Sequence, residues 1–240
     1  MKLFGKQEPA PPFVTAIIAA AGSSRRMGGE DKQKMDLCGI PVLGRTLLAF
    51  EQCALVREII VAAGEDRVVD YADLGSALGI SKLTRVIRGG VTRMESVWLA
   101  AQEIDPGCEY LAVHDGARPL VTPALIEQVC RDAFAHSAAV AAVPVYDTIK
   151  QAGADGRIDK TVDRALLRAA QTPQAADRAL LLAAIQSARE AGFAATDECA
   201  ALERMGVRPW LTPGEESNRK ITTPIDLVFA RAVLEERGTV

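Results

Sequence analysis

The sequence has few of the features that mark a nucleic-acid-binding or a membrane protein. Its formal net charge is only −3 over 240 residues, so it lacks the basic field that draws a protein onto nucleic acid or an anionic membrane. It also shows no internal repeat and no low-complexity segment. We therefore expect neither nucleic acid nor a membrane as a partner. Any bound anion has to be held by local Arg and Lys side chains.

Cysteine is scarce and scattered. The five cysteines form no C-x-x-C pair and have no neighbouring His cluster, which argues against both a zinc site and a clear disulfide framework. An odd, dispersed set of thiols suits a reducing compartment, where such residues serve as small core hydrophobes. We therefore expect a cytoplasmic protein. The cysteines are Cys38, Cys53, Cys108, Cys130 and Cys199.

The N-terminus has part of a signal-peptide pattern, because Lys2 and Lys6 precede an apolar run from Phe13 to Ala21. Glu8 and a proline cluster interrupt the change from charged to apolar residues, which disfavours that reading. The run is also far shorter than the roughly 20 residues of a membrane span. We interpret residues 1–12 as a flexible lead-in and residues 13–240 as a single domain.

Apolar runs of strand length alternate with stretches of helical period, which is typical of an α/β protein with a mainly parallel sheet. The runs are apolar almost throughout, so helices are expected to flank both faces of the sheet. The predicted strands are Val14 to Ala20, Glu58 to Ala63, Leu83 to Ile87, Tyr110 to His114, Ala138 to Val143 and Val207 to Leu211. The predicted helices are Val42 to Cys53, Arg67 to Leu78, Arg93 to Ile104, Pro123 to Ala135, Ala175 to Ala191 and Pro224 to Glu236, with Thr122, Thr196 and Thr223 as candidate N-caps.

The stretch from Val145 to Gln174 breaks this rhythm, since it is polar, alternating and interrupted by glycine. We interpret it as a β arm that protrudes from the main domain at about residues 145–174. Such an arm is poorly covered by its own chain and would be most stable against a second subunit. A surface hairpin without a partner fits the composition equally well, so both alternatives remain open.

The first loop with chemical potential runs from Ala20 to Lys32, directly after the first predicted strand. Ligands of α/β sheets collect at the carboxyl ends of strands, where the small residues around Gly22 would let backbone N–H groups approach phosphate oxygens. Arg26 and Lys32 supply positive charge. Polyphosphate binding follows as a hypothesis, and a plain turn with exposed bases is the alternative. The P-loop and dinucleotide fingerprints are absent, which disfavours an NAD-dependent oxidoreductase.

Two further loops follow predicted strands. Asp115 could hold a hydrated Mg²⁺ together with substrate phosphates, although a turn or capping role is common for a lone Asp at such a place. His114 beside it is more typical of a structural residue. Gly90 would leave room for a flat base, and Ser96 could hydrogen-bond a base edge.

Taken together, these motifs and several downstream ones resemble the 2-C-methyl-D-erythritol 4-phosphate cytidylyltransferase family, in the same order and over nearly the whole chain from Val14. They are Ala20-Ala21-Gly22 through Arg26-Met27, Lys32-Gln33, Gly89-Gly90 with Arg93 and Ser96-Val97, His114-Asp115-Gly116-Ala117-Arg118-Pro119, Val143-Pro144-Val145 with Asp147-Thr148-Ile149-Lys150, Thr161-Val162-Asp163-Arg164, Gln171-Thr172-Pro173-Gln174, Thr196-Asp197-Glu198 and Asn218-Arg219-Lys220-Ile221-Thr222.

The resemblance implies a Rossmann-like nucleotidyltransferase fold and a homodimer joined through the β arm. It also implies a reaction of the nonmevalonate isoprenoid route, in which CTP and methylerythritol phosphate give 4-diphosphocytidyl-2-C-methyl-D-erythritol and pyrophosphate with Mg²⁺.

The resemblance also implies roles for individual residues. The catalytic residues would be Arg26, Lys32, Arg164 and Lys220, with Arg164 reaching across the dimer. The nucleotide would be bound by Ala20, Ala21, Gly22, Gly90, Ser96 and Asp115, and Asp115 would hold the metal. The polyol phosphate would contact Asp115, Arg118, Thr148, Arg164, Thr172, Thr196 and Lys220.

Two positions depart from the usual family pattern, because Asp31 stands where Pro is common and Lys34 where Tyr is common. Asp31 could repel phosphate, and Lys34 leaves open which lysine reaches the α-phosphate, although the register to Leu37 favours Lys32. Two alternative functions also remain: a ribitol 5-phosphate cytidylyltransferase and a catalytically silent CTP-binding protein.

Overall fold

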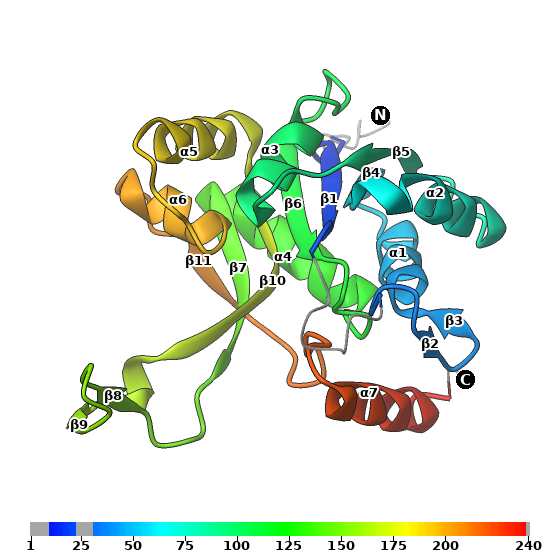
Figure 1. Cartoon of the computed structure of the whole chain (residues 1–240). Helices are drawn as coiled ribbons and strands as arrows, with labels where there is room; N and C mark the ends of the chain where they lie inside the picture. Colours follow the sequence, from blue (N-terminus) through cyan, green and yellow to red (C-terminus); the bar gives the residue numbers. More distant parts are fainter. Residues whose placement is uncertain (1–9, 23–30, 239–240) are drawn as a thin grey trace, which may run out of the picture.

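The computed structural model describes residues 10–22 and 31–238, and its centre is a seven-stranded sheet (Figure 1). The strand order is β11-β7-β10-β6-β1-β4-β5, and only β10 runs antiparallel to its two neighbours. The predicted mainly parallel α/β sheet is therefore confirmed. Its strands are β1 (Val14–Ala20), β4 (Val56–Ala63), β5 (Leu83–Arg88), β6 (Tyr110–Asp115), β7 (Ala138–Pro144), β10 (Arg168–Asp177) and β11 (Trp210–Pro213).

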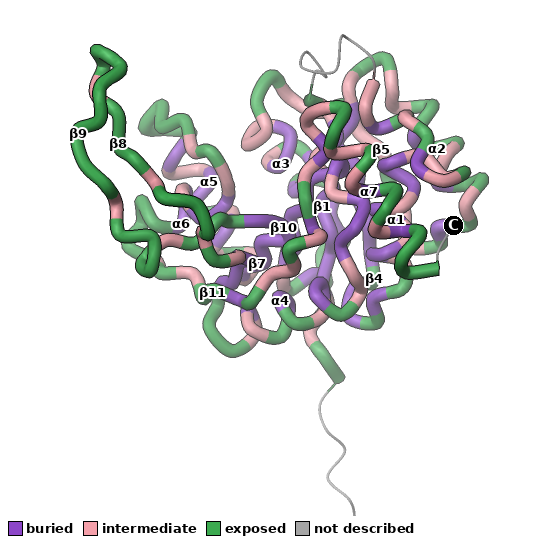
Figure 2. The backbone as a smooth tube through the Cα atoms, turned by 90° about the horizontal axis from the view of Figure 1, so that it is seen from below, coloured by how far each residue is buried: buried purple, intermediate pink, exposed green. Residues whose placement is uncertain are grey.

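Helices cover both faces of this sheet and form two separate cores. Along β1 the side chains alternate between the faces, so Ala16 and Ile18 enter one core and Ile17 the other. The first core contains α1 (Val42–Gln52), α2 (Val68–Ala77) and α4 (Pro123–His136), and the second contains α3 (Arg93–Ala101), α5 (Arg178–Glu190) and α6 (Glu198–Arg204). The buried stretches of the tube in Figure 2 follow these layers.

The order of the strands creates a switch point next to β1. The chain passes from β1 to β4 and β5 on one side and then returns to β6 on the other side of β1. Ala19 near the end of β1 pairs in register with Asp115 at the end of β6. In open α/β sheets this crevice is where ligands bind.

A smaller core fixes the C-terminal helix α7 (Pro224–Glu236) beside the hairpin of β2 (Asp36–Leu37) and β3 (Ile40–Pro41). Leu37, Ile221 and Leu234 are buried together there. Ile221 directly follows Lys220, so this packing also holds the segment that carries one predicted site lysine.

The segment before α5 differs from the prediction. Arg168–Asp177 forms β10, so the helix predicted from Ala175 begins at Arg178, and the arm predicted to extend to Gln174 ends before Arg168. This segment is rich in alanine, and Thr172 is its only β-branched residue, so its local sequence does not favour a strand. It forms a strand because it pairs with β7 on one side and with β6 on the other.

Two smaller predictions also need correction. Asp197 rather than Thr196 caps α6, since its carboxylate accepts a hydrogen bond from the Ala200 N–H at 2.9 Å. The strand predicted from Val207 starts at Trp210, because the Val207 N–H is bonded to the Leu202 carbonyl in the turn that ends α6. Thr122 does cap α4, as predicted.

The protruding arm consists of β8 (Lys150–Ala152), β9 (Ile158–Thr161) and the short 3-10 helix η3 (Arg164–Leu166), and it extends away from the sheet (Figures 1 and 2). Ile158 and Leu166 are 64% and 83% exposed. Most of the predicted lead-in, residues 1–9, lies outside the described residues. None of the helices in the described ranges combines the length and the apolar composition that a membrane span requires.

Candidate active site

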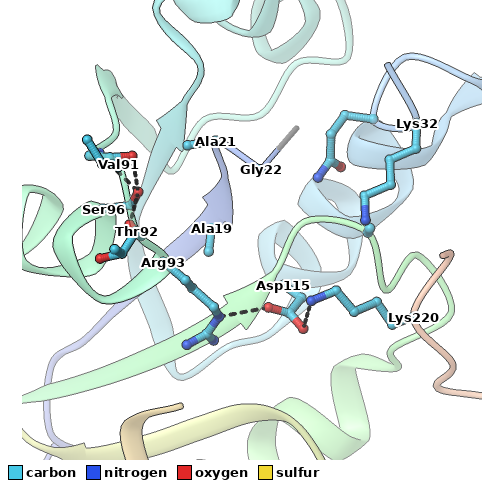
Figure 3. A pocket seen from close by; sticks show the side chains of 13 residues that line it. Ala19, Ala21, Gly22, Lys32, Val91, Thr92, Arg93, Ser96, Asp115 and Lys220 are labelled. Carbon is cyan, nitrogen blue, oxygen red and sulfur yellow. Dashed lines mark hydrogen bonds and ion pairs between the residues drawn. The ribbon is translucent and has the colours of Figure 1, made fainter. Parts of the chain in front are cut away.

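A pocket opens at the switch point, at the carboxyl ends of β1, β5 and β6 (Figure 3). Seven of the predicted site residues line it, namely Ala21, Gly22, Lys32, Gly90, Ser96, Asp115 and Lys220. The other lining residues are Ala19, Gln33, Val91, Thr92, Arg93 and Ala117. Segments that are far apart in the sequence therefore meet in one site.

Asp115 is the centre of an ion-pair cluster in this pocket. Its Oδ1 lies 3.0 Å from Arg93 Nε, and its Oδ2 lies 2.9 Å from Lys220 Nζ and 3.5 Å from Arg118 Nε. In Figure 3, Arg93 and Lys220 approach the carboxylate from opposite sides. Burial by itself would raise the pKa of Asp115, but the charges of Arg93 and Lys220 outweigh burial and hold it well below its usual value. The carboxylate therefore stays ionised and fixes the directions of the surrounding cations.

His114 supports Asp115 from within the core. Burial lowers the pKa of His114 to about 3, so its ring is neutral. Its Nε2 lies 3.3 Å from the Arg118 carbonyl oxygen, which can only accept, so Nε2 carries the proton and Nδ1 accepts from the Thr172 hydroxyl at 3.0 Å. Thr172 in turn accepts from the Asp115 N–H at 3.1 Å. The interpretation of His114 as a structural residue agrees with these contacts.

Asp31 and Lys34, the two departures from the family pattern, both point away from the pocket lining. Asp31 accepts a hydrogen bond from the Tyr71 hydroxyl at 2.9 Å and pairs with Arg67 at 3.2 Å. Lys34 pairs with Asp70 on α2. Asp31 therefore has a cationic partner in Arg67, and Lys32, not Lys34, is the lysine that lines the pocket.

The loop after β5 packs closely against the residue that follows β1. A Cβ on Gly89 would lie 2.6 Å from the Ala21 Cβ, so glycine is needed for this close approach. The Ser96 hydroxyl accepts from the Gly90 N–H at 3.0 Å and donates to the Thr92 carbonyl at 2.9 Å. In this structure Ser96 therefore shapes the loop, while its predicted contact with a base stays a prediction.

The remaining predicted residues that the structure describes lie outside the pocket lining. Arg118 and Thr172 stand behind Asp115, and Ala20 lies between two lining residues of β1 and its loop. The other three are exposed: Thr196 precedes α6, while Thr148 and Arg164 lie on the arm, where Arg164 donates to the Tyr146 carbonyl. Arg26 lies outside the described residues.

Among the described residues, two charged members of the ion-pair network, Arg93 and Glu198, are missing from the predicted set. Arg93 lines the pocket, and its Nη1 lies 2.6 Å from Glu198 Oε1 at the start of α6. The position of Arg93 in the first turn of a helix after a strand end was the available signal. Glu198 stands in the Thr196-Asp197-Glu198 motif, but that motif does not predict its ion pair, because its side chain reaches Arg93 across 105 positions of sequence.

Hydrogen bonds hold the segment around Lys220, residues 218–223, both before and after the lysine. The Asn218 side chain donates to the Thr172 carbonyl at 2.8 Å, and the Ile221 N–H donates to the Ala117 carbonyl at 2.8 Å. After Lys220, Asp226 Oδ2 accepts four hydrogen bonds of 2.8 to 2.9 Å from the backbone N–H and hydroxyl groups of Thr222 and Thr223. This arrangement resembles a capping box at the start of α7.

Replacing Asp226 with alanine is expected to lower the free energy of unfolding by about 1 kcal/mol, because the bonds that start α7 are lost. Burial would raise the pKa of Asp226, but its hydrogen bonds to Thr222 and Thr223 lower it. The stabilisation is therefore present above the carboxyl's unfolded pKa and is lost as pH falls through the folded one. Urea unfolding at neutral and acidic pH measures both effects. Glu236→Ala in the same helix is the control and should change stability by less than about 0.5 kcal/mol.

The metal prediction can be tested for fit against the donor set. The described residues contain no group of three or more His, Cys, Asp or Glu side chains that could hold a metal ion. Among the described residues that line the pocket, Asp115 is the single carboxylate. Mg²⁺ commonly binds through one or two carboxylates together with substrate phosphates and water, so this donor set fits a metal that arrives with a nucleotide.

Comparison with known proteins agrees with this geometry. The sequence profile of the family described as IspD, 2-C-methyl-D-erythritol 4-phosphate cytidylyltransferase, matches residues 14–236. A curated relative of that name from Symbiobacterium thermophilum is 45% identical, and the match covers 94% of this chain and 94% of the relative. Another from Pelotomaculum thermopropionicum is 40% identical, and the match covers 93% of this chain and 95% of the relative.

Solved structures give the same result. The 4-diphosphocytidyl-2C-methyl-D-erythritol synthase of Anaerococcus prevotii is 30% identical, with a TM-score of 0.84 over 93% of this chain and 99% of that one. The 2-C-methyl-D-erythritol 4-phosphate cytidylyltransferase of Thermus thermophilus, also 30% identical, has a TM-score of 0.74 over 92% and 98%. These structures confirm the predicted Rossmann-like nucleotidyltransferase fold. The matching profile and relatives show that the chain belongs to the 2-C-methyl-D-erythritol 4-phosphate cytidylyltransferase family.

Proposed function

We propose that this protein transfers CMP from CTP to 2-C-methyl-D-erythritol 4-phosphate in the synthesis of isoprenoid precursors. A phosphate oxygen of the polyol attacks the α-phosphorus of CTP, a new P–O bond forms, and the bond to the bridging oxygen of the leaving pyrophosphate breaks. The observation that carries this proposal is the ion-pair cluster of Arg93, Arg118 and Lys220 around Asp115. Lys32 lines the same pocket, beside the small-residue loop at the end of β1.

The charge balance of this cluster suits two phosphorylated substrates. Among the described residues, four cationic side chains stand against the two carboxylates of Asp115 and Glu198, an excess of two positive charges. Phosphoryl transfer depends mostly on positioning and electrostatic stabilisation, and it needs no covalent enzyme intermediate. We assign charge stabilisation at the α-phosphate to Lys32, together with Arg26, and placement of the attacking phosphate to Lys220.

Lys220 can change its partner within the pocket. Its side chain is 37% exposed, whereas that of Asp115 is only 9% exposed. An incoming phosphate can therefore compete for the Lys220 ammonium while Asp115 stays in place. Release of Lys220 would leave Oδ2 of Asp115 with only its longer contact of 3.5 Å to Arg118, which makes room for another ligand.

Mg²⁺ is the proposed cofactor, with Asp115 as the protein ligand. When bound with the nucleotide, it would neutralise charge on the phosphates. The support is that Asp115 is ionised and lines the pocket.

A homodimer joined through the arm is the proposed assembly. Tyr146, Ile158 and Leu166 expose apolar surface on a segment that has little contact with its own domain. The same segment carries Thr148 and Arg164, which we assign to the polyol phosphate of the partner's site. A cytoplasmic location is proposed because the five cysteines are free thiols and Cys53, Cys108, Cys130 and Cys199 are buried.

A pyrophosphate-release assay with Mg²⁺ tests the function. CTP, UTP, ATP and GTP are each combined with methylerythritol phosphate and with ribitol 5-phosphate. We expect rapid release only for CTP with methylerythritol phosphate. Preference for ribitol 5-phosphate would establish the alternative substrate, and no CTP-dependent release with either polyol would leave a silent CTP-binding protein. Omitting Mg²⁺ in the productive combination tests the cofactor.

A further inference from the structure

Arg93 connects two parts of the pocket that the sequence places far apart. It is the first residue of α3, and its Nε contacts Asp115 Oδ1 at 3.0 Å. Its Nη1 contacts Glu198 Oε1 at 2.6 Å, at the first residue of α6. One guanidinium therefore bridges two carboxylates through two different nitrogens, which a lysine ammonium cannot reproduce in the same geometry.

The two oxygens of Asp115 have different kinds of partner. Oδ1 faces Arg93, whose own position is fixed by Glu198, a side chain that is only 4% exposed. Oδ2 lies 2.9 Å from Lys220 Nζ and 3.5 Å from Arg118 Nε. Among these three cations the Lys220 side chain is the most exposed, at 37% against 25% for Arg93 and 13% for Arg118. The Arg93 contact at Oδ1 is therefore the fixed one, and at Oδ2 the Lys220 contact is the one that can exchange.

We propose that Arg93, held by Glu198, is a positioning residue that fixes the Asp115 carboxylate while Lys220 exchanges its contact from Asp115 to the incoming phosphate. This inference rests on the proposed cytidylyl transfer. Arg93 acts through Asp115 in this arrangement, so its loss misplaces the carboxylate and Lys220 more than it weakens nucleotide binding. Misplacement of a catalytic group by about 1 Å can cost roughly 10²-fold in rate.

The test uses Arg93→Lys, Glu198→Gln and the double variant in the full-length protein. We expect Arg93→Lys to lower kcat by about 10- to 100-fold. The Kd for CTP, measured by calorimetry without the polyol, should change by less than about threefold, since substrate binding is largely kept. Glu198→Gln should lower kcat by a smaller factor and likewise leave the Kd for CTP nearly unchanged. The kcat of the double variant should equal that of Arg93→Lys within about twofold, because Glu198 acts through Arg93.

Arg85 and Glu103 offer a matched control, because they form a solvent-exposed Arg–Glu pair between β5 and the residues after α3. Arg85→Lys with Glu103→Gln should leave kcat unchanged. The proposal is overturned if Arg93→Lys keeps normal kcat, if kcat falls only together with CTP affinity and melting temperature, or if the two single losses multiply in the double variant. If Arg93→Lys does not fold, an unchanged kcat in Glu198→Gln is enough to reject the proposal. Absence of activity in the unmodified protein would instead refute the proposed function itself.

Discussion

Lys32→Ala is expected to lower turnover by roughly 10² to 10³-fold, the typical cost of removing one preorganised group that stabilises developing charge. Lys32 lines the pocket, and its Nζ donates to the Ile221 carbonyl at 3.2 Å, which places the ammonium beside the Lys220 segment. The measurement is the rate of pyrophosphate release at saturating CTP and polyol phosphate. Because Lys32 is only partly buried, the melting temperature should change much less than the turnover.

Lys34→Ala is the matched control for this prediction. Lys34 lies two positions away but pairs with Asp70 on α2, and both side chains are more than 40% exposed. A surface ion pair of this kind contributes little to stability, so both turnover and melting temperature should stay near those of the unmodified protein. Normal turnover in Lys32→Ala, or a large loss in Lys34→Ala, would contradict the assignment of the α-phosphate to Lys32.

Arg164→Ala is expected to lower kcat/KM for the polyol phosphate by roughly 10²-fold and to leave CTP binding nearly unchanged, because it removes one cation from the attacking substrate only. Arg164 is exposed on the arm and is absent from the pocket lining of its own chain. Its action therefore depends on the proposed dimer, in which the arm of one chain completes the site of the other.

Mixing Lys32→Ala chains with Arg164→Ala chains tests that arrangement directly. Each variant alone has two defective sites. In a mixed dimer the Arg164→Ala chain supplies an intact pocket and the Lys32→Ala chain supplies an intact arm, so one of the two sites is restored. With random exchange of equal amounts, half of the dimers are mixed, and activity should rise to about a quarter of that of the unmodified protein. No recovery after proven subunit exchange would mean that Arg164 serves its own chain, and a monomer at micromolar concentration would reject the dimer.

The strands that carry the pocket loops could be predicted from local pattern. Val14–Ala20 and Tyr110–Asp115 are short, apolar on both faces and followed by loops with glycine or charge. β10 could not, because its alanine-rich sequence gives no strand signal and its conformation depends on pairing with β6 and β7.

The same distinction applies to the site. The sequence alone determined that the loops at Gly22, Gly90 and Asp115 share one sheet edge, since residues that follow parallel strands are brought together by the fold class. The register to Leu37 favoured Lys32 over Lys34, but the tertiary structure decided that Lys32 lines the pocket. It likewise decided that Arg93 and Glu198 hold Asp115. The physical reason is that long side chains can point several ways from one backbone position, and their direction is set by partners distant in the sequence, such as Asp70 and Glu198.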